Sequence, residues 1–342
     1  MCVSASDRVY FPVDKKSKSL TLVWVFLLSL LLVLSAQSGK PGPNRQPLEL
    51  RIPVWVRNGS NEFQKGLEAQ DFRVTDGNET VKVLGLQGPE SPALLFVALD
   101  TVGDIANIDQ ARAALKEEVG KLGPQYWVGL LSARETLEVL QDPSPDRDLI
   151  DQKLDTFSQL GKAGLLESIQ SIAELSNRIL QRSRARVSVI LVTDSDIGNY
   201  RQDYLNPPVN YSDSRDLSRR FAGRALQEKI SRMTLAMSRY QAPIFIVHID
   251  PLQDALNRAY QNGLKQLAEA SGGQLFLSKT VVDVPTMIQE AFRWAGSCYV
   301  LDCLVPLTSK GTMKIHILLA ENSESTQPVG RLTYASRILL KK

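Results

Sequence analysis

The chain has 342 residues, of which 43% are hydrophobic, so it is long enough to form one large globular domain and a smaller one. Its 40 basic and 37 acidic residues give a formal net charge of only +3, and no run of five or more basic residues occurs. The sequence therefore predicts no nucleic-acid partner, because proteins that bind nucleic acids usually carry clustered basic residues.

The N-terminal part of the chain carries a hydrophobic run, Leu20–Ala36, which follows three lysines and contains no charge. Such a run predicts targeting to a membrane, either as a cleaved signal peptide or as a single transmembrane anchor at residues 19–36. Leu34 is too large for a good small-residue cleavage site, which favours a retained anchor, but both alternatives stay open. Residues 1–18 are then expected in the cytoplasm and everything after Gln37 outside it, in the periplasm or secreted if the signal is cleaved.

Residues 37–47 are rich in Gly, Pro and polar side chains and predict a flexible linker, because they cannot build a core. Residues 48–90 change to short alternating runs, LELRIPVWV, DFRVTDG and ETVKVLGLQ, separated by Asn-Gly and Asp-Gly turn signals. This pattern predicts three strands of an antiparallel sheet.

Residues 91–296 alternate between strand-like and helix-like patterns, which is typical of a parallel sheet with crossover helices. The expected elements in chain order are a strand at 93–100, a helix at 105–121, strands at 126–133 and 136–140, helices at 146–157 and 165–181, a strand at 186–194, a helix carrying Leu226, Ile230, Met233 and Met237, a strand at 243–249, a helix ending at 270, a strand at 274–277 and a helix at 284–295. We therefore expect an α/β domain with a doubly wound, mostly parallel sheet. Asp100 ends the first strand, so it lies at the carboxyl edge, where such sheets bind their ligands.

Residues 297–342 return to β-type runs, SCYVLDCLVP, TMKIHILLA and VGRLTYASRILLKK. Three strands before the α/β domain and about three after it are each too few for a stable sheet. We therefore predict that residues 48–90 and 297–342 pair into one small flanking β-sandwich-like module.

The cysteines and histidines predict structural roles. Cys298 and Cys303 fall in one strand-like run, and five strand residues span roughly 16 Å, well beyond the limit of about 7 Å between Cα atoms that a disulfide allows. Both are expected to be small buried residues. His248 and His316 lie inside apolar runs, where a lone histidine is more often structural than catalytic.

Four stretches of the chain carry a resemblance to a known family, in the order in which that family has them: GLEAQDFRVTDGNETVKVLGL, ALLFVALDTVGD, LAEASGGQLFL and CYVLDCLVP. With Val192-Thr193-Asp194, they make the chain resemble a von Willebrand factor type A (VWFA) domain, and more narrowly the VWFA-related family of exported bacterial proteins. The resemblance covers nearly everything from Leu48 to Lys342. It implies a protein-binding or adhesion-type role in the cell envelope.

In that family a divalent cation is held by Asp-x-Ser-x-Ser, a Thr from a second loop and an Asp from a third. Asp100 and Asp194 match the two aspartates, but Val102 and Asp104 replace the serines and Ala163 stands where the Thr belongs. The adhesion-type metal site therefore cannot be carried over as a whole. Asp100, Asp104 and Asp194 remain candidate carboxylate ligands for Mg²⁺ or Ca²⁺. The alternative is that Asp104 only caps the helix that follows it.

A polar insertion at residues 196–220 follows Asp194 and supplies a candidate contact surface for an unidentified protein partner, because its amphipathic and hydrogen-bonding side chains suit adaptable contacts. The alternative is a disordered surface loop around Pro207-Pro208. The candidate partner-binding residues are Tyr200, Arg201, Tyr204, Asn206, Tyr211 and Arg215.

No catalytic motif is found in the sequence, neither a Gly-x-Ser-x-Gly elbow nor a phosphate-binding Gly-x-x-x-x-Gly-Lys. A haloacid-dehalogenase-like phosphatase needs an Asp two residues after the strand-end nucleophile, and Val102 occupies that position. We therefore expect a non-enzymatic, extracytoplasmic binding module. The alternative is an envelope scaffold or assembly component with no ligand or metal.

Overall fold

The computed structural model describes residues 48–103, 105–134, 136–157, 163–197, 217–305, 311–320 and 329–340. The hydrophobic run at 20–36, Asp104 and the candidate contact residues between 200 and 215 lie outside these ranges. Within these ranges, no helix is both long and apolar enough to cross a membrane.

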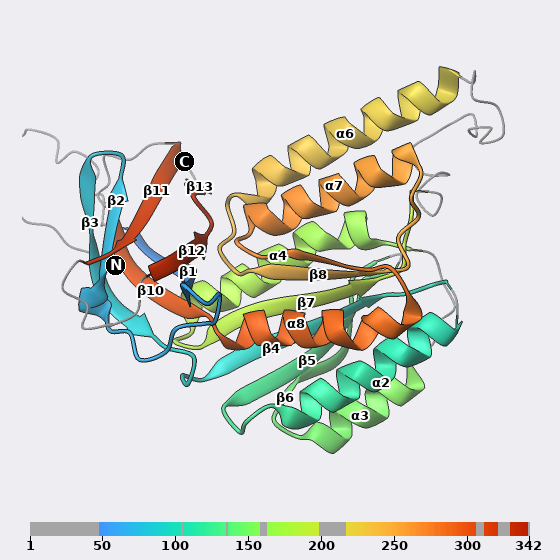
Figure 1. The fold of residues 1–342 in the computed structure, drawn as a ribbon, viewed down its shortest axis with the longest axis horizontal. Helices are drawn as coiled ribbons and strands as arrows, with labels where there is room; N and C mark the ends of the chain where they lie inside the picture. The colour runs from blue at the N-terminus through green and yellow to red at the C-terminus, as the bar shows by residue number, and fades with distance from the viewer. Residues whose placement is uncertain are drawn as a thin grey trace, which may run out of the picture. The chain divides into compact units, whose positions relative to one another are not determined.

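The α/β domain is built on a six-stranded sheet with helices on both faces (Figure 1). Its strands are β4 (Ala93–Asp100), β5 (Tyr126–Ser132), β6 (Glu138–Ser144), β7 (Arg186–Thr193), β8 (Ile244–Ile249) and β9 (Leu275–Ser278). Its helices are α2 (Ile105–Lys121), α3 (Arg147–Thr156), α4 (Leu165–Arg182), α6 (Leu217–Met237), α7 (Ala255–Ala270) and α8 (Val284–Gly296), with a short 3-10 turn η2 (Val281–Asp283) before α8.

The strand order is β6-β5-β4-β7-β8-β9, and all neighbours run parallel except the pair β5 and β6. The chain therefore winds outward from β4 in one direction and then from β7 in the other, which defines a doubly wound sheet. The expected fold class is confirmed: an α/β domain with a mostly parallel six-stranded sheet, accompanied by an antiparallel module.

Helices cover both faces of this sheet. Helices α2, α3 and α8 contact one another on one face, and α4, α6 and α7 contact one another on the other. Leu226, Ile230, Met233 and Met237 of α6 are buried, so the apolar stripe expected there belongs to the core. The helices of the second face contact β7, β8 and β9 most closely.

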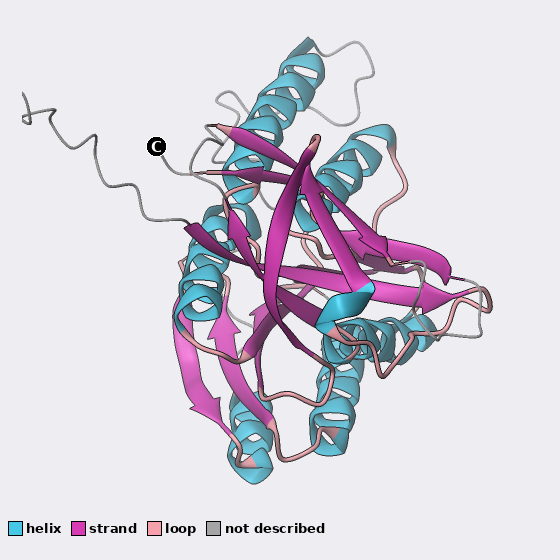
Figure 2. Ribbon diagram, turned by 90° about the vertical axis from the view of Figure 1, so that its left-hand side faces the viewer, coloured by secondary structure: helices cyan, strands magenta, loops and turns pink. Residues whose placement is uncertain are grey.

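The antiparallel module is one curled sheet of seven strands in the order β12-β1-β10-β3-β2-β11-β13 (Figure 2). Its members are β1 (Leu48–Asn58), β2 (Phe72–Asp76), β3 (Glu79–Gln87), β10 (Tyr299–Val305), β11 (Thr312–Leu319), β12 (Val329–Tyr334) and β13 (Arg337–Leu339), with a 3-10 turn η1 (Ala69–Asp71) before β2. Strands from before and after the α/β domain therefore pair directly, as expected. The run expected as one last strand is divided into β12 and β13 at Ala335-Ser336, and the two strands lie at opposite edges of the sheet.

Strand β1 joins the two cores because successive side chains of a strand point to opposite faces. Ile52 and Val54 lie in the core of the module, whereas Trp55 belongs to the core of the α/β domain and is completely buried. The ring of Trp55 packs against Phe245 at a centroid distance of 5.7 Å, and its Nε1 donates a hydrogen bond of 2.7 Å to the carbonyl of Trp294. A Trp in this alternating run is thus an anchor between sheet and domain.

Two buried arginines make further contacts between the module and the α/β domain. Arg51 of β1 forms an ion pair of 2.9 Å with Asp302 of the neighbouring strand β10. Its guanidinium also donates to three backbone carbonyls and one side-chain amide, those of Leu180, Ser183, Ala185 and Gln87. Those carbonyls end α4, where a helix leaves its last acceptors without internal partners.

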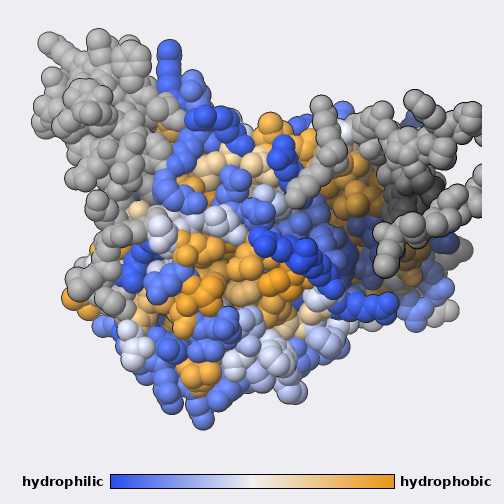
Figure 3. Space-filling view, turned by 180° about the vertical axis from the view of Figure 1, so that it is seen from behind, coloured by the Kyte–Doolittle hydropathy of each residue, from blue (hydrophilic) through white to orange (hydrophobic). Residues whose placement is uncertain are grey.

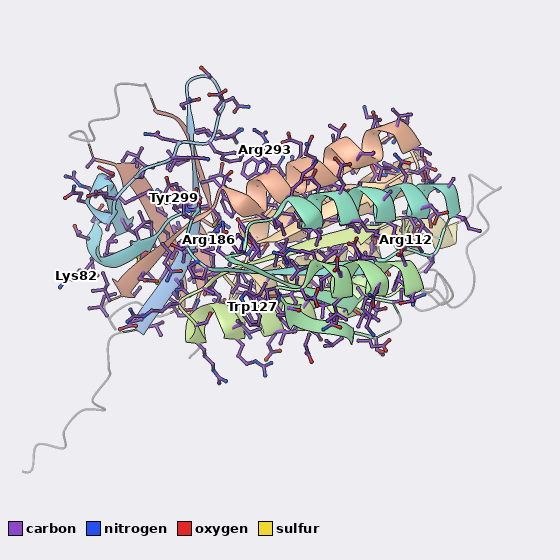
Figure 4. All side chains as sticks on the ribbon, turned by 90° about the horizontal axis from the view of Figure 1, so that it is seen from below. Lys82, Arg112, Trp127, Arg186, Arg293 and Tyr299 are labelled. Atoms are coloured by element: carbon purple, nitrogen blue, oxygen red, sulfur yellow. The ribbon has the colours of Figure 1, made fainter. Side chains whose placement is uncertain are left out.

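Arg186, the first residue of β7, is also buried and lies between the module and the helices (Figure 4). Its guanidinium donates to acceptors in the segment before β4, at the end of α8 and in β5. These acceptors are the carbonyls of Pro89, Ser91, Ala295, Gly296 and Cys298 and the hydroxyl of Tyr126.

Cys298 and Cys303 are both buried and free, as expected from their spacing. Burial raises the pKa of each thiol to about 12. At neutral pH both thiols are therefore protonated and unreactive.

We expect Arg186→Met to destabilise the fold severely, because it leaves several buried acceptors without a donor, each at roughly 1 to 3 kcal/mol. The measurement is urea unfolding of the variant beside Arg184→Met, an exposed arginine two residues away in the chain. A loss of at least about 3 kcal/mol for Arg186→Met and little for Arg184→Met is expected. Equal stability of the two variants would contradict the proposed role of Arg186.

Candidate functional site

The candidate site lies where β4 and β7 end. The two strands are parallel neighbours, and their register pairs Asp100 with Thr193, so Asp100 and Asp194 end adjacent strands. Figure 1 shows both strands running away from the antiparallel module, so this edge is at the far end of the α/β domain. The expected juxtaposition of the two carboxylates is present.

Asp100 is completely buried, and its carboxylate accepts hydrogen bonds from two other loops. The amide of Gly164, at the start of α4, donates to Oδ1 at 2.9 Å, and the hydroxyls of Thr193 and Ser195 donate to Oδ2 at 3.0 and 2.6 Å. Burial raises the pKa of Asp100 to about 7, and the three hydrogen bonds oppose that rise. The carboxylate thus holds the ends of β4 and β7 and the start of α4 together.

Asp194, which follows β7, accepts hydrogen bonds from the loop that follows β4. Its Oδ1 accepts from the amide of Val102 at 2.9 Å and its Oδ2 from the amide of Gly103 at 2.6 Å. A Cβ atom on Gly103 would lie only 2.7 Å from Oδ2, so a glycine permits this close approach. Burial raises the pKa of Asp194, and the two amides lower it.

Behind the carboxylates, His248 and Asn257 hold the loop that follows β7. Nε2 of His248 lies 2.7 Å from the carbonyl of Ser195, to which it donates, and Asn257 accepts from the amide of Ile197 at 2.9 Å. His248 is buried, and burial lowers its pKa, so the ring is neutral and structural, as expected from its apolar run. Thr193, Ser195 and Gly164 were not predicted as site residues; the only sequence signal was hydroxyl residues on both sides of Asp194.

The described residues do not fit the metal centre of the resembled family. Val102 and Ala163 stand where that family has hydroxyl ligands, and neither side chain carries an oxygen. Across the described residues, no group of three or more His, Cys, Asp or Glu side chains is placed to hold a metal ion. Asp104 lies outside these residues, so the three-carboxylate site with Mg²⁺ or Ca²⁺ stays a prediction.

The phosphatase alternative requires a nucleophile that a substrate reaches. Asp100 has no exposed surface, and both its oxygens accept hydrogen bonds from the protein. This geometry disfavours nucleophilic attack by Asp100. The candidate contact residues Tyr200, Arg201, Tyr204, Asn206, Tyr211 and Arg215 lie outside the described residues, and their role also stays a prediction.

The outer surface of β5 and β6 is a second feature of the domain. Trp127 of β5 and Val139 of β6 are both 51% exposed, and Leu94, opposite Trp127 on β4, is only partly buried. Figure 4 labels Trp127 on the α/β domain. Figure 3 shows apolar side chains on the face of the molecule opposite to the view of Figure 1. We call Leu94, Trp127 and Val139 the β5–β6 patch.

Comparison with known proteins gives no match to any protein-family model and no match to a curated protein. Among solved structures the chain is similar to the vWF domain of the type V pili tip protein Mfa5 from Porphyromonas gingivalis, with 14% identity and a TM-score of 0.40 over 59% of this chain and 93% of that one. It is also similar to the conserved hypothetical protein BatB from Bacteroides thetaiotaomicron, with 13% identity and a TM-score of 0.38 over 60% and 100% of the two chains. A von Willebrand factor type A protein from Catenulispora acidiphila gives 11% identity and a TM-score of 0.40 over 87% and 74%. These likenesses concern the arrangement of helices and strands alone.

We expect Asp100 to make folding stability fall as the pH rises from about 4 to about 7. Its pKa is about 7 in the folded protein and 3.8 for an ordinary Asp, so the folded state binds the extra proton in this range. The stability that this proton binding contributes is fully present below the pKa of the unfolded state. It is lost as the pH rises through the pKa of the folded state, and the total loss is on the order of 4 kcal/mol.

Urea unfolding over this pH range measures the effect by comparing the wild type with Asp100→Asn. As the pH rises, the free energy of unfolding of Asp100→Asn should increase steadily relative to that of the wild type. Asp109→Asn, a half-exposed carboxylate on α2, serves as the control that keeps the wild-type slope. Parallel curves for the wild type and Asp100→Asn would contradict the shifted pKa.

Proposed function

We propose that this chain is a non-enzymatic, membrane-anchored or exported binding module, whose α/β domain contacts a protein partner outside the cytoplasm without a bridging metal ion. The observation that carries the proposal is the burial and hydrogen bonding of the Asp100 carboxylate. The strand-end carboxylate is completely buried and accepts three hydrogen bonds from the protein, so it offers neither a nucleophile nor an open coordination position.

The absence of hydroxyl ligands at Val102 and Ala163 supports the metal-free form of the proposal. An adhesion-type site uses an open coordination position on the cation to accept a carboxylate from its partner. A site whose carboxylates are engaged by backbone amides and hydroxyls has no such position to offer. The contact with the partner is then made by side chains of the surface.

The β5–β6 patch supports a surface contact of this kind. Tryptophan is enriched at interface hot spots, because its large ring gains much when it is desolvated. Trp127 has half of its surface in solvent and lies directly opposite Leu94 in the register of β4 and β5. We infer that the partner presents an apolar surface to this patch, with the insertion at residues 196–220 as a second candidate contact.

The N-terminal sequence supports the proposed location. Leu20–Ala36 is uncharged and follows lysines, which favours an extracytoplasmic position for everything after it. The alternative function, an envelope scaffold or assembly component, shares this location but needs no partner other than neighbouring copies of the chain.

Site-specific photocrosslinking in membrane fractions tests the proposal, with the crosslinker placed at Trp127 in one variant and at Leu318 in another. Leu318 is 58% exposed on β11 of the antiparallel module and serves as the matched control. We expect one discrete adduct with a different protein from position 127, none from position 318, and the same yield when EDTA is present.

Substitution of the patch provides the second readout. Leu94→Asp should reduce the adduct from position 127 strongly, because Leu94 lies directly opposite Trp127, whereas Leu235→Asp, a 61% exposed residue of α6, should leave it unchanged. An adduct only with a second copy of the chain favours the scaffold alternative. An adduct that disappears in EDTA contradicts the metal-free contact, and equal labelling from positions 127 and 318 contradicts the role of the patch.

A further inference from the structure

The face of β1 that is turned toward the α/β domain carries two arginines with opposite cross-strand neighbours. Arg51 lies directly opposite Asp302 of β10, with which it forms an ion pair. Arg57 lies directly opposite Arg331 of the edge strand β12. Opposite charges across an antiparallel pair stabilise it and like charges destabilise it. The pair Arg57 and Arg331 is therefore unfavourable unless an anion lies between the two side chains.

Among the described residues, the charges that act on Arg57 most strongly are those of other arginines. Its Nη1 donates to the neutral side chain of Asn61 at 2.6 Å, and its guanidinium lies 5.1 Å from the centre of the Trp294 ring. Nε is buried and, among the described residues, has no hydrogen-bond acceptor. Burial lowers the pKa of Arg57, and the nearby charges of Arg331 and Arg293 lower it further. Arg293 is itself paired with a carboxylate of its own helix.

A cavity of about 490 Å³ opens at this position, between β1 and β12 on one side and α7, β9 and α8 on the other. Arg57, Arg331 and Lys265 contribute three positive charges to its lining and Glu269 one negative charge. Lys265 and Glu269 lie 3.8 Å apart, so the two arginines account for the excess charge. Leu275 and Leu277 of β9 form an apolar part of the wall.

We propose that this cavity, the Arg57–Arg331 pocket, binds a phosphate-bearing anion. Guanidinium groups recognise phosphate oxygens with paired, charge-assisted hydrogen bonds, and a phosphate dianion offsets the repulsion between two arginines. The volume falls within the usual range for small-molecule sites and exceeds that of a bare phosphate, and the leucines suit a small organic part. The ligand is thus a phosphate monoester, either a soluble one or the headgroup of phosphatidic acid.

Thermal unfolding of the full-length chain in detergent, with inorganic phosphate titrated against chloride at matched ionic strength, tests this proposal. A ligand that binds only the folded state raises the melting temperature, and above its Kd the rise grows with the logarithm of its concentration. We expect such a rise for the wild type. The Arg331→Gln variant should bind phosphate at least about tenfold more weakly, since a charge-assisted hydrogen bond is removed.

Two properties separate binding from a general structural role. Without phosphate, Arg331→Gln should melt no lower than the wild type, because it removes a like-charge neighbour from an exposed position. Arg73→Gln, an exposed arginine on β2 of the same sheet, should keep the wild-type response to phosphate. An absent response in the wild type, or an equal response in Arg331→Gln, would overturn the proposal.

Two further ligands distinguish the possible sources of the phosphate. Glycerol 3-phosphate and short-chain phosphatidic acid carry the same phosphate monoester, but only the second carries acyl chains. Equal affinities indicate a soluble ligand, and a clearly higher affinity for phosphatidic acid indicates a lipid headgroup. In either case Arg331→Gln should bind the ligand at least about tenfold more weakly than the wild type.

Discussion

The burial of one carboxylate organises the carboxyl edge of this protein. Asp100 ends a central strand with no access to solvent, so its oxygens must find donors within the fold. They find them in the amide of Gly164 and in the hydroxyls of Thr193 and Ser195. Because these donors come from the start of α4 and the end of β7, a single side chain holds three segments in place. Asp194 in turn accepts hydrogen bonds from two backbone amides of the loop that follows Asp100.

This arrangement gives a physical meaning to the departures from the resembled family. Val102 and Ala163 stand where the resembled family has two hydroxyl ligands, while Thr193 and Ser195 donate hydrogen bonds to the carboxylate of Asp100. The geometry of a strand-end aspartate pair is retained although its surroundings favour hydrogen bonds over coordination. The proposed binding role is then assigned to the surface, where the β5–β6 patch and the Arg57–Arg331 pocket are the candidate contacts.

Much of the fold could be predicted from the sequence, because local patterns decide it. The helix at 105–121 and the strand at 79–87 have the expected bounds, and the alternation of elements was sufficient for the doubly wound sheet. The long-range contacts could not be predicted. Nothing near Arg186 in the sequence indicates that its guanidinium reaches the carbonyls of Ala295 and Cys298. These contacts depend on how distant segments pack, and a single sequence does not record that.

The candidate site also contains residues that could be predicted from the sequence and residues that could not. Asp100 and Asp194 could be predicted, because two apolar runs end in carboxylates and parallel strands bring such ends together. Their hydrogen-bond donors could not, since Gly164 acts through its backbone and Ser195 is one of many serines. The like-charge pair of Arg57 and Arg331 was equally hidden, because it depends on the register between β1 and β12.

The central claim is that the carboxyl edge is completed by the protein's own donors and not by a metal ion. Calorimetric titration of the full-length chain in detergent with Mg²⁺ and with Ca²⁺ tests it most directly, with Asp100→Ala measured in parallel. The account predicts no saturable heat at millimolar metal and no difference between the two proteins. Saturable binding in the wild type that Asp100→Ala abolishes would contradict it.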